Sequence, residues 1–244
     1  MKCLTLILIA LITPIISASA FEETYLRAQN AYDNGNYAEA VVLYQDLIRD
    51  GLTNMELHYN LANAAFKDGD LPLAVRHYRL AWYQAPRDPD IQANLHFALN
   101  AAGAIEPTSS LQERFLKSLS NDEWSAMALG SYLLLALILT LSLLIRTASP
   151  VLLKLSLLPT ALLILSFAGI RGWSRLERSP EWVVVKAEAT ALHSPINGSA
   201  AYYKIPQGAL VQQKRTDPKG WVEVQYDKRS GWLKADDYIQ RLSP

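Results

Sequence analysis

Hydrophobic positions change their spacing twice along the chain, and each change marks a different kind of element. Residues 21–103 place apolar side chains at helical intervals, residues 124–170 hold two nearly continuous apolar runs, and residues 181–244 alternate with a period of two. These patterns predict amphipathic helices, membrane-spanning helices and half-buried strands, respectively. The sequence therefore predicts a multidomain α plus β protein with a helical N-terminal domain, a helical hairpin and a small all-β C-terminal barrel.

The two apolar runs predict transmembrane helices at residues 124–145 and 150–170. The first run contains no charged side chain, and about 20 apolar residues at ~1.5 Å each cross a ~30 Å hydrocarbon core. The second run is long enough only if it begins at Pro150 and Lys154 extends its ammonium group to the membrane surface. The segment Arg146–Pro150 allows only a reversal of the chain. The alternative is a pair of buried core helices in a soluble protein.

The start of the chain has the three parts of a secretory signal. Lys2 precedes an apolar stretch that ends at Ile16, and Ser17–Ala20 supplies an A-x-A-like cleavage site. This order predicts a signal peptide at residues 1–20, with an uncleaved anchor as the alternative. Cys3 is the only cysteine, so the cleaved chain would have no disulfide, thiolate metal ligand or thiol nucleophile.

An exported N-terminus followed by two spans predicts that both terminal domains lie outside the cytoplasm, anchored in the inner membrane of a bacterium. The turn between the spans is then cytoplasmic, and Arg146 and Lys154 agree with the positive-inside rule. Arg171, Arg175 and Arg178 follow the second span on the predicted outer side and oppose this orientation. We give the signal peptide more weight, because spans inserted as a tight hairpin are less free to choose their orientation.

A pattern of glycine, alanine and tyrosine recurs after thirty-four residues. The first copy is Gly35, Ala40 and Tyr44, and the second is Gly69, Ala74 and Tyr78. This is the period of the tetratricopeptide repeat, a helix–turn–helix unit, and it predicts repeats at residues 21–54 and 55–88. The glycines allow a tight reversal after the first helix of each pair.

Two repeats leave an apolar face exposed, and residues 89–102 predict a capping helix that covers it. Asp88 can cap this helix, Pro89 opens it, and Gly103 ends it. Its apolar stripe consists of Ile91, Leu95, Ala98 and Leu99.

In tetratricopeptide repeats the first helices line a concave groove that binds a peptide or the tail of a partner protein. Aromatic and amide side chains suit an extended peptide, whose backbone needs hydrogen-bond partners. The alternative, for Phe66 and Phe97 especially, is ordinary packing. By position, the predicted partner-binding residues are Tyr25, Gln29, Tyr32, Tyr59, Asn60, Asn63, Phe66, Lys67, Asn94 and Phe97.

Residues 104–123 predict a linker with a short amphipathic helix at Leu111–Leu116. Its Phe115 and Leu116 would lie at the membrane surface. Trp124 begins the first span and Trp173 follows the second, so we expect both to be interfacial aromatic residues.

The C-terminal pattern predicts a barrel of about five strands at residues 181–244. Short strands at 183–185, 209–211, 221–224 and 231–233 alternate with turns rich in proline, glycine, asparagine and aspartate. The Pro206–Gly208 turn and the strands Gly220–Val224 and Gly231–Leu233 resemble the bacterial SH3 domain. Four aromatic residues are candidates for a ligand cleft, with the barrel core as the alternative: Tyr202, Trp221, Tyr226 and Trp232.

The order of these modules resembles the BatE family, tetratricopeptide-repeat membrane proteins of the Bat (aerotolerance) cluster. The chain departs from the family in having only two repeats and in carrying Leu71 where an aromatic residue is usual. The resemblance implies a membrane-anchored scaffold in an envelope complex with von Willebrand A domain proteins, and it implies no enzymatic activity.

The sequence predicts neither an enzyme nor a metal or cofactor site. Its four histidines, at positions 58, 77, 96 and 193, form no metal-binding motif, and no phosphate loop or nucleophile motif is present. Residues 21–106 carry twelve acidic and six basic side chains, and residues 171–244 carry eight acidic and twelve basic ones. These net charges of −6 and +4, together with export, argue against binding to nucleic acid.

Two hypotheses for function follow. In the first, the repeats bind the exported segment of a partner protein, and the chain acts as a scaffold. In the second, the SH3-like barrel binds an envelope ligand, namely peptidoglycan.

Overall fold

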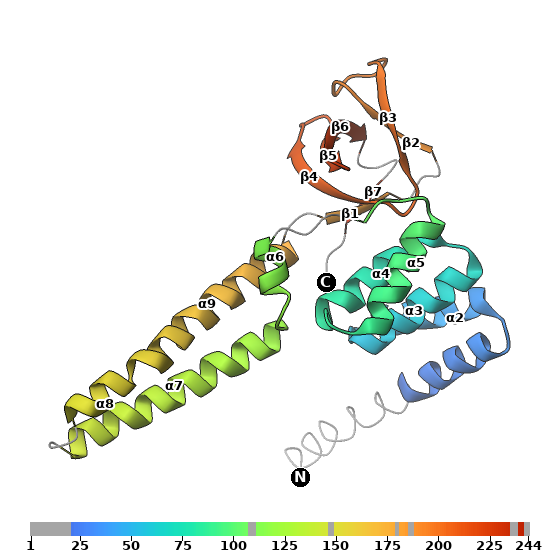
Figure 1. The fold of residues 1–244 in the computed structure, drawn as a ribbon. Helices are drawn as coiled ribbons and strands as arrows, with labels where there is room; N and C mark the ends of the chain where they lie inside the picture. Colours follow the sequence, from blue (N-terminus) through green and yellow to red (C-terminus); the bar gives the residue numbers. More distant parts are fainter. Residues whose placement is uncertain are drawn as a thin grey trace, which may run out of the picture.

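The computed structural model describes residues 21–106, 111–145, 149–178, 181–184, 188–234 and 239–241. The predicted signal peptide, at 1–20, and Arg146 lie outside the described residues. Helices occupy the described chain as far as Arg178, and strands follow (Figure 1). This confirms the predicted division into an N-terminal helical region, two apolar helices and a C-terminal antiparallel sheet.

The N-terminal region is a row of antiparallel helices, each packed on the next. Large side chains from successive helices, such as Tyr44, Leu57 and Leu61, are fully buried between them. The helices are a first one over residues 21–33, α2 (Tyr37–Arg49), α3 (Met55–Asp68), α4 (Leu71–Gln84) and α5 (Pro89–Ala101).

The ends of these helices follow the sequence signals. Gly69 ends α3 with φ +91°, a left-handed conformation that residues with a Cβ rarely adopt. The Asp88 carboxylate accepts hydrogen bonds from the N–H groups of Asp90 (2.9 Å) and Ile91 (3.1 Å) at the start of α5. The predicted glycine terminus and the predicted Asp88–Pro89 helix start are both confirmed.

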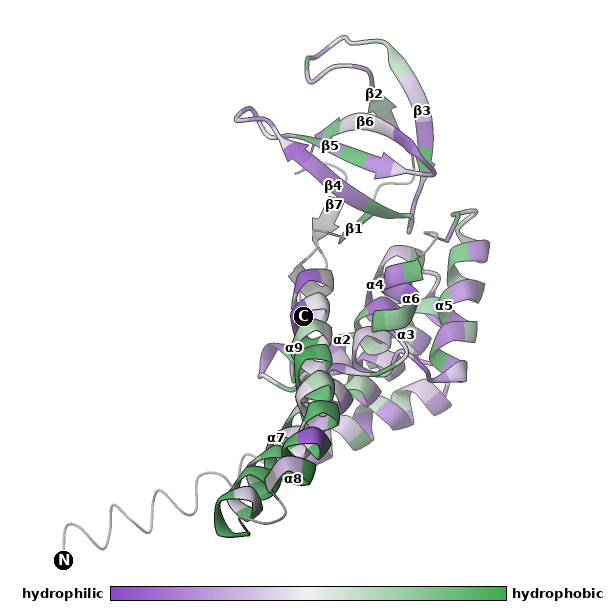
Figure 2. Cartoon of the chain, turned by 60° about the vertical axis from the view of Figure 1, so that its left-hand side comes forward, coloured by the Kyte–Doolittle hydropathy of each residue, from purple (hydrophilic) through white to green (hydrophobic). Residues whose placement is uncertain are grey.

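The apolar hairpin consists of α7 (Asn121–Leu144), α8 (Ser149–Leu155) and α9 (Leu157–Arg178). Pro159 lacks the N–H that would bond to the carbonyl of Leu155, which explains why the second arm breaks at Ser156. Two segments, Asn121–Leu144 and Pro150–Arg175, are long and apolar enough to span a membrane. The described chain buries only 11% and 17% of their apolar windows, so it does not cover them as core helices (Figure 2).

The C-terminal sheet is antiparallel throughout and curls into a half-barrel. Its order is β3-β2-β6-β5-β4-β1-β7, and within the described residues the outer strands β3 and β7 do not pair with each other. The strands are β1 (Glu181–Val184), β2 (Glu188–Leu192), β3 (Ala201–Pro206), β4 (Leu210–Thr216), β5 (Trp221–Tyr226), β6 (Arg229–Lys234) and β7 (Ile239–Arg241).

The sequence predicted a small barrel of about five strands, and the described residues form a seven-stranded sheet that curls into a half-barrel. The sequence pattern did not reveal β2, β3 or β7. In β2 the buried positions are the small residues Ala189 and Ala191, which give little hydrophobic alternation. β7 has only three residues, which is too short for a period of two to stand out.

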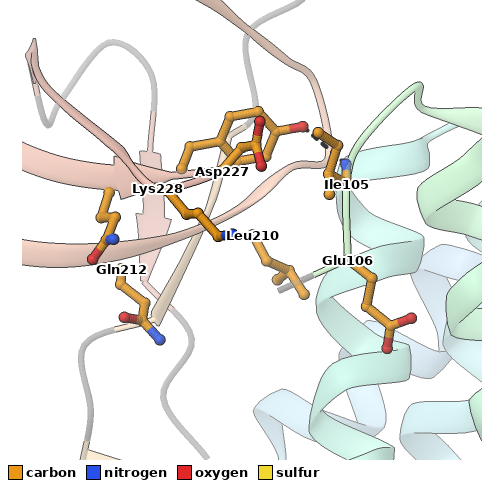
Figure 3. Close-up of a pocket in the computed structure, with 8 residues that line it drawn as sticks. Ile105, Glu106, Leu210, Gln212, Asp227 and Lys228 are labelled. Atoms are coloured by element: carbon orange, nitrogen blue, oxygen red, sulfur yellow. Dashed lines mark hydrogen bonds between the residues drawn. The ribbon is translucent and has the colours of Figure 1, made fainter. Parts of the chain in front are cut away.

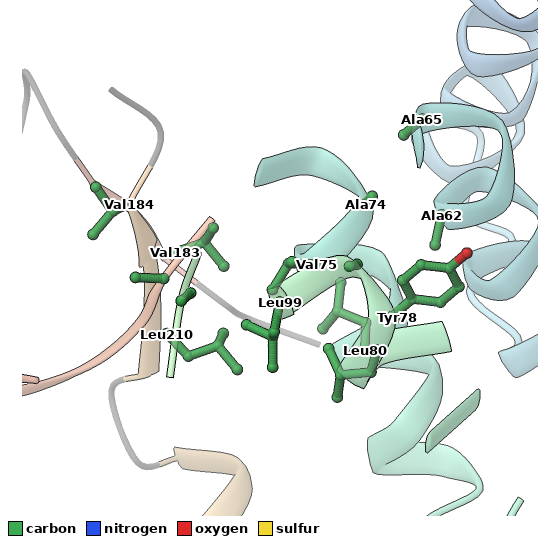
Figure 4. Close-up of a cluster of buried hydrophobic side chains, with 14 of the residues drawn as sticks. Ala62, Ala65, Ala74, Val75, Tyr78, Leu80, Leu99, Val183, Val184 and Leu210 are labelled. Carbon is green, nitrogen blue, oxygen red and sulfur yellow. The ribbon is translucent and has the colours of Figure 1, made fainter. Parts of the chain in front are cut away.

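The half-barrel and the helical region share one continuous hydrophobic core. Figure 4 shows Val183 and Leu210 of the sheet facing Leu99 of α5, with Val75 and Leu80 of α4 behind it. Nearby, the Tyr226 hydroxyl accepts a hydrogen bond from the N–H of Ile105 at 2.9 Å, beside a small cavity of about 130 Å³ (Figure 3). The sheet therefore covers the apolar end of the helical row together with α5.

Candidate functional site

One face of the helical row, which we call the inner face, contains Tyr25, Tyr59, Asn60 and Asn94. It carries the same pair of contacts twice. The Asn60 amide donates to the Tyr25 hydroxyl at 2.8 Å, and the Asn94 amide donates to the Tyr59 hydroxyl at 2.8 Å. Each tyrosine ring also meets a second tyrosine edge-on at 5.9 Å between centroids, Tyr44 in one case and Tyr78 in the other. Partners in the two copies lie thirty-four residues apart, so the sequence period is repeated in side-chain geometry.

Further hydrogen bonds fix these tyrosines as neutral phenols. The Tyr25 hydroxyl donates to a Glu56 carboxylate oxygen at 2.7 Å, and the Tyr78 hydroxyl donates to the Asn63 carbonyl oxygen at 2.6 Å. Burial raises the pKa of Tyr44 to about 12, and burial with the nearby Glu56 carboxylate raises the pKa of Tyr25. The inner face thus presents polar groups that keep their hydrogen-bonding roles at neutral pH.

A cavity of about 300 Å³ opens on this face. Four of the predicted partner-binding residues line it, together with an acidic and an aromatic neighbour. Tyr25, Tyr59 and Asn94 brace the helices in the hydrogen-bonded pairs described above. The lining residues are Gln29, Tyr32, Asp33, Tyr44, Asn60 and Asn63.

The remaining predicted residues extend the row towards the end of α3. The Phe66 and Phe97 rings pack at 5.4 Å between centroids, which agrees with the packing alternative for Phe66. Phe97 nevertheless keeps 62% of its surface exposed, and Lys67 is also exposed. Phe97 is therefore both packed and accessible.

Two buried histidines form a pair that sequence reasoning missed. His58 of α3 and His77 of α4 lie with their Nδ1 atoms 3.0 Å apart, and Arg76 Nη1 lies 3.3 Å from His77 Nε2. Because a guanidinium only donates, His77 Nε2 accepts, and the His77 Nδ1 proton points to His58. The midpoint of positions 58 and 77 falls near Gly69, the turn of an antiparallel hairpin, and this signal could have predicted the contact.

Burial keeps both histidines neutral. Desolvation, followed by the positive charge of Arg76, lowers the pKa of His58 to about 4. The same causes hold the pKa of His77 well below its ordinary value. Two uncharged imidazole rings therefore contact each other between α3 and α4.

Trp124 and Trp173 join the apolar hairpin to the segment that precedes it. The indole N–H of Trp124 donates to the Leu116 carbonyl at 3.1 Å, and that of Trp173 donates to the carbonyls of Leu116 (3.0 Å) and Leu119 (2.9 Å). Both side chains are fully buried. This corrects the expectation that they face the membrane interface, because their N–H groups are satisfied by backbone carbonyls within the chain.

We call this arrangement the tryptophan junction (Leu116–Leu119, Trp124 and Trp173). Two glycines of α9 leave the space that it occupies. A Cβ at Gly169 of α9 would lie 2.3 Å from the Trp124 ring, and one at Gly172 would lie 2.6 Å from Leu116. α6 (Leu111–Leu116), which confirms the helix predicted in the linker, thus rests on the end of α9. Arg87, after α4, pairs with Glu123 in the first turn of α7 and connects the helical row to the same place.

The four aromatic residues predicted to form a cleft in the C-terminal sheet do not gather at one place. Trp232 pairs with Glu223 across the β5–β6 ladder, so Trp221 and Trp232 share one face, while Tyr226 points to the other. Tyr202 is exposed, and its ring contacts the ring of His193 in a tilted arrangement with 4.2 Å between centroids. Tyr226 belongs to the shared hydrophobic core, as the core alternative expected, whereas Trp221 is buried on the opposite face of the sheet. Ligand binding by the sheet stays a prediction.

Among the described residues, no group of three or more His, Cys, Asp or Glu side chains is placed to hold a metal ion. The expectation of no metal, cofactor or catalytic site stays a prediction. Comparisons of the sequence with protein-family models and with curated proteins found no match.

Proposed function

We propose that this protein is a membrane-anchored scaffold that binds an extended segment of a partner protein on the inner face of its helical row. The observation that carries the proposal is the duplicated Tyr–Asn pair beside a cavity lined by amide and phenol groups. It supports the interpretation of residues 21–88 as two tetratricopeptide repeats followed by a capping helix. Such repeats use this face to hold peptides.

The chemistry of the groove suits a peptide backbone. Gln29, Asn60 and Asn63 bring amide groups to the cavity, and amides can both donate to a carbonyl and accept from an N–H. Phe97 offers an exposed apolar surface for a side chain of the partner. Asp33 lines the cavity and the helical region is acidic overall, so a partner segment rich in carboxylates is disfavoured.

The two apolar helices anchor this scaffold in a membrane. Their length and the exposure of their leucines support insertion into a bilayer. We place both terminal domains outside the cytoplasm of a bacterium, because a signal peptide and two spans return the chain to the same side. Alkaline phosphatase fused after Pro244 should then be active, because that reporter folds only outside the cytoplasm. If a phosphatase fusion at Ser149 were active and the fusion at Pro244 were not, the topology would be the opposite of the one proposed.

The resemblance to the BatE family supplies the class of partner. Exported segments of von Willebrand A domain membrane proteins are the proposed occupants of the groove. The half-barrel, which we interpret as SH3-like, supports the end of the repeats through their shared core. It is therefore a structural part of the scaffold in this proposal.

Partner capture by groove variants tests the proposal. Gln29→Ala combined with Phe97→Ser removes an amide and an exposed ring that take no part in the Tyr–Asn pairs. Loss of one buried anchor commonly costs about 2 kcal/mol at an interface, so we expect capture to fall at least tenfold in co-purification from solubilised membranes. Val42→Ser is the matched control, because Val42 is an apolar side chain of α2 that is 55% exposed. Wild-type capture by the folded double variant would refute the groove.

A further inference from the structure

The end of α9 that leads into the sheet carries a cavity of its own, apart from the one on the inner face. Its volume is about 530 Å³, and its described wall consists of Phe167, Ile170, Arg171, Ser174 and Arg175. Residues three and four apart are neighbours on the surface of a helix, so these five side chains share one face of α9. Binding of a peptide on the inner face leaves this cavity without a role.

This face of α9 points away from the helices against which α9 packs. Gly169 faces the Trp124 ring of α7, and the Trp173 indole is buried in the tryptophan junction. Two residues along an α-helix turn the direction of the side chain by about 200°. Arg171 and Arg175, each two residues from Trp173, therefore lie on the opposite side of α9, where both are exposed.

The charge of the described wall comes from two guanidinium groups. Arg171 and Arg175 are four residues apart, so their like charges are neighbours and repel each other. In the part of the chain that the structure describes, no carboxylate lines the cavity and neither guanidinium takes part in a salt bridge. An anion placed between the two groups lowers their repulsion, and the oxygen atoms of a phosphate fit the planar donors of arginine.

The two arginines lie where the apolar part of α9 ends. Ile164 and Phe167, one to two turns earlier in the helix, are 66% and 62% exposed. Towards the sheet, the hydrophobic residues of this arm give way to hydrophilic ones (Figure 2). A spanning helix that changes from exposed apolar side chains to basic ones reaches the lipid headgroups at that level.

Membrane orientation does not account for these arginines. In the proposed topology they lie on the outer side, where the positive-inside rule expects fewer basic residues. Their position on the side of α9 opposite the tryptophan junction indicates a ligand that approaches from the bilayer.

We propose that Arg171 and Arg175 bind the phosphate of an anionic phospholipid in the outer leaflet of the membrane. Ser174 lies on the same face and can donate its hydroxyl hydrogen to a phosphate oxygen. The acyl chains extend along α9 beside Phe167 and Ile164. This site rests on the proposed membrane anchoring and adds the recognition of a specific class of lipid to it.

Lipid retention by the purified full chain tests the site. The chain is solubilised in detergent with equal amounts of phosphatidylglycerol and phosphatidylcholine, and the lipids that it retains are measured by native mass spectrometry. We expect wild type to prefer phosphatidylglycerol and to retain about tenfold more of it than Arg171→Gln with Arg175→Gln. Arg171→Lys with Arg175→Lys keeps both charges and should keep most of the retained lipid.

The matched control removes two positive charges from the half-barrel. Lys204 of β3 and Lys214 of β4 are exposed and do not line the cavity. Lys204→Gln with Lys214→Gln should retain phosphatidylglycerol as wild type does, with circular dichroism as the control for folding of every variant. Equal loss in the two glutamine double variants would show an effect of net charge alone and overturn the site. Equal retention of the two lipids by wild type would overturn it as well.

Two further measurements separate the lipid from other occupants and from the anchoring itself. Inorganic phosphate or an acidic peptide that displaces phosphatidylglycerol at equal concentration would overturn the lipid in favour of a soluble anion or a protein partner. Flotation with phosphatidylcholine vesicles measures membrane anchoring alone. A chain that floats but shows no preference for phosphatidylglycerol refutes the lipid site, and a chain that does not float refutes membrane anchoring as well.

Discussion

The inner face of the helical row and the tryptophan junction both join helices through aromatic side chains that form hydrogen bonds, but they do so differently. On the inner face, tyrosine hydroxyls meet side-chain amides, and most of these residues remain half-buried. At the junction, two fully buried indoles donate to backbone carbonyls of one short segment. The first arrangement is repeated along the row, and the second is found at one place among the residues that the structure describes.

In the proposed function, the inner face recognises the partner and the tryptophan junction stabilises the fold. A half-buried side chain on a repeated face can be exchanged with little loss of stability, which leaves that face free to specify a partner. Removal of the buried Trp173 indole takes away the hydrogen bond to the Leu119 carbonyl and one of the two indole hydrogen bonds to the Leu116 carbonyl. We therefore expect changes at the junction to affect folding and changes at the groove to affect binding.

Trp173→Ala should have the largest effect on stability. It removes a fully buried ring and leaves the Leu116 and Leu119 carbonyls short of a donor, so we expect a loss of about 3–5 kcal/mol. Thermal unfolding of the full chain in detergent measures the loss. Tyr202→Ala is the control, because Tyr202 is 47% exposed and its loss should cost far less. Equal melting of the two variants would contradict the role of the junction.

Gly169→Ala tests the same junction by adding an atom. The new Cβ would lie 2.3 Å from the Trp124 ring, and we expect a loss of about 3 kcal/mol. Gly130→Ala in α7 is the matched control, since no described atom lies within 4 Å of its added Cβ. A difference should appear in the melting temperatures of the two full-length variants. If both melt together, α9 does not hold Trp124 in the way described.

Acid should destabilise the helical row through the histidine pair. The folded pKa of His58, about 4, lies below the ordinary value of 6.5, so the unfolded chain binds more protons between these values. Stability is therefore fully present above pH 6.5 and falls by about 3 kcal/mol as the pH drops towards 4. Unfolding of wild type and of His58→Gln with His77→Gln across this range measures the effect.

The double variant should show a flatter dependence of stability on pH than wild type. Val42→Ser is the control, because Val42 is 55% exposed on α2 and carries no titratable group. Identical curves for wild type and the double variant would show that the buried pair does not titrate as described.

The smallest expected change lies outside both regions, in the turn between β5 and β6. Asp227 and Lys228 have φ of 45° and 64°, and Gly adopts such angles more readily than Lys. Lys228→Gly should therefore stabilise the chain by roughly 0.5–1 kcal/mol in chemical unfolding. Lys219→Gly, in a turn where Gly220 already takes the positive φ, should give no gain. A loss at position 228 would contradict the turn geometry.

Local signals predicted more of this molecule than long-range ones. The αL end at Gly69, the Asp88 cap and the apolar arms follow from neighbouring residues, and the sequence revealed each of them. Trp173 and the Leu116 carbonyl are 57 residues apart. Any residue can offer a backbone carbonyl, so the identity of residue 116 does not indicate this hydrogen bond. The tryptophan junction could not be predicted for that reason.

The candidate sites show the same limit. Thirty-four-residue spacing predicted Gln29, Tyr32, Asn60 and Asn63, which the fold brings to one cavity. It could not separate the residues that brace the helices, such as Tyr25, from those open to a partner, because both occupy the same face. A further cavity, of about 670 Å³, lies between α4, α5 and α6, and only the docking of the linker onto the helical row creates it.

Site-specific photo-crosslinking in intact membranes tests the central claim most directly. A photoreactive residue at position 29 lies in the cavity on the inner face, and one at position 42 lies on the exposed side of α2. We expect position 29 to crosslink the partner that Gln29→Ala with Phe97→Ser fails to capture, and position 42 to yield no such product. Crosslinking of that partner from position 42 and not from position 29 would contradict the groove as the working surface.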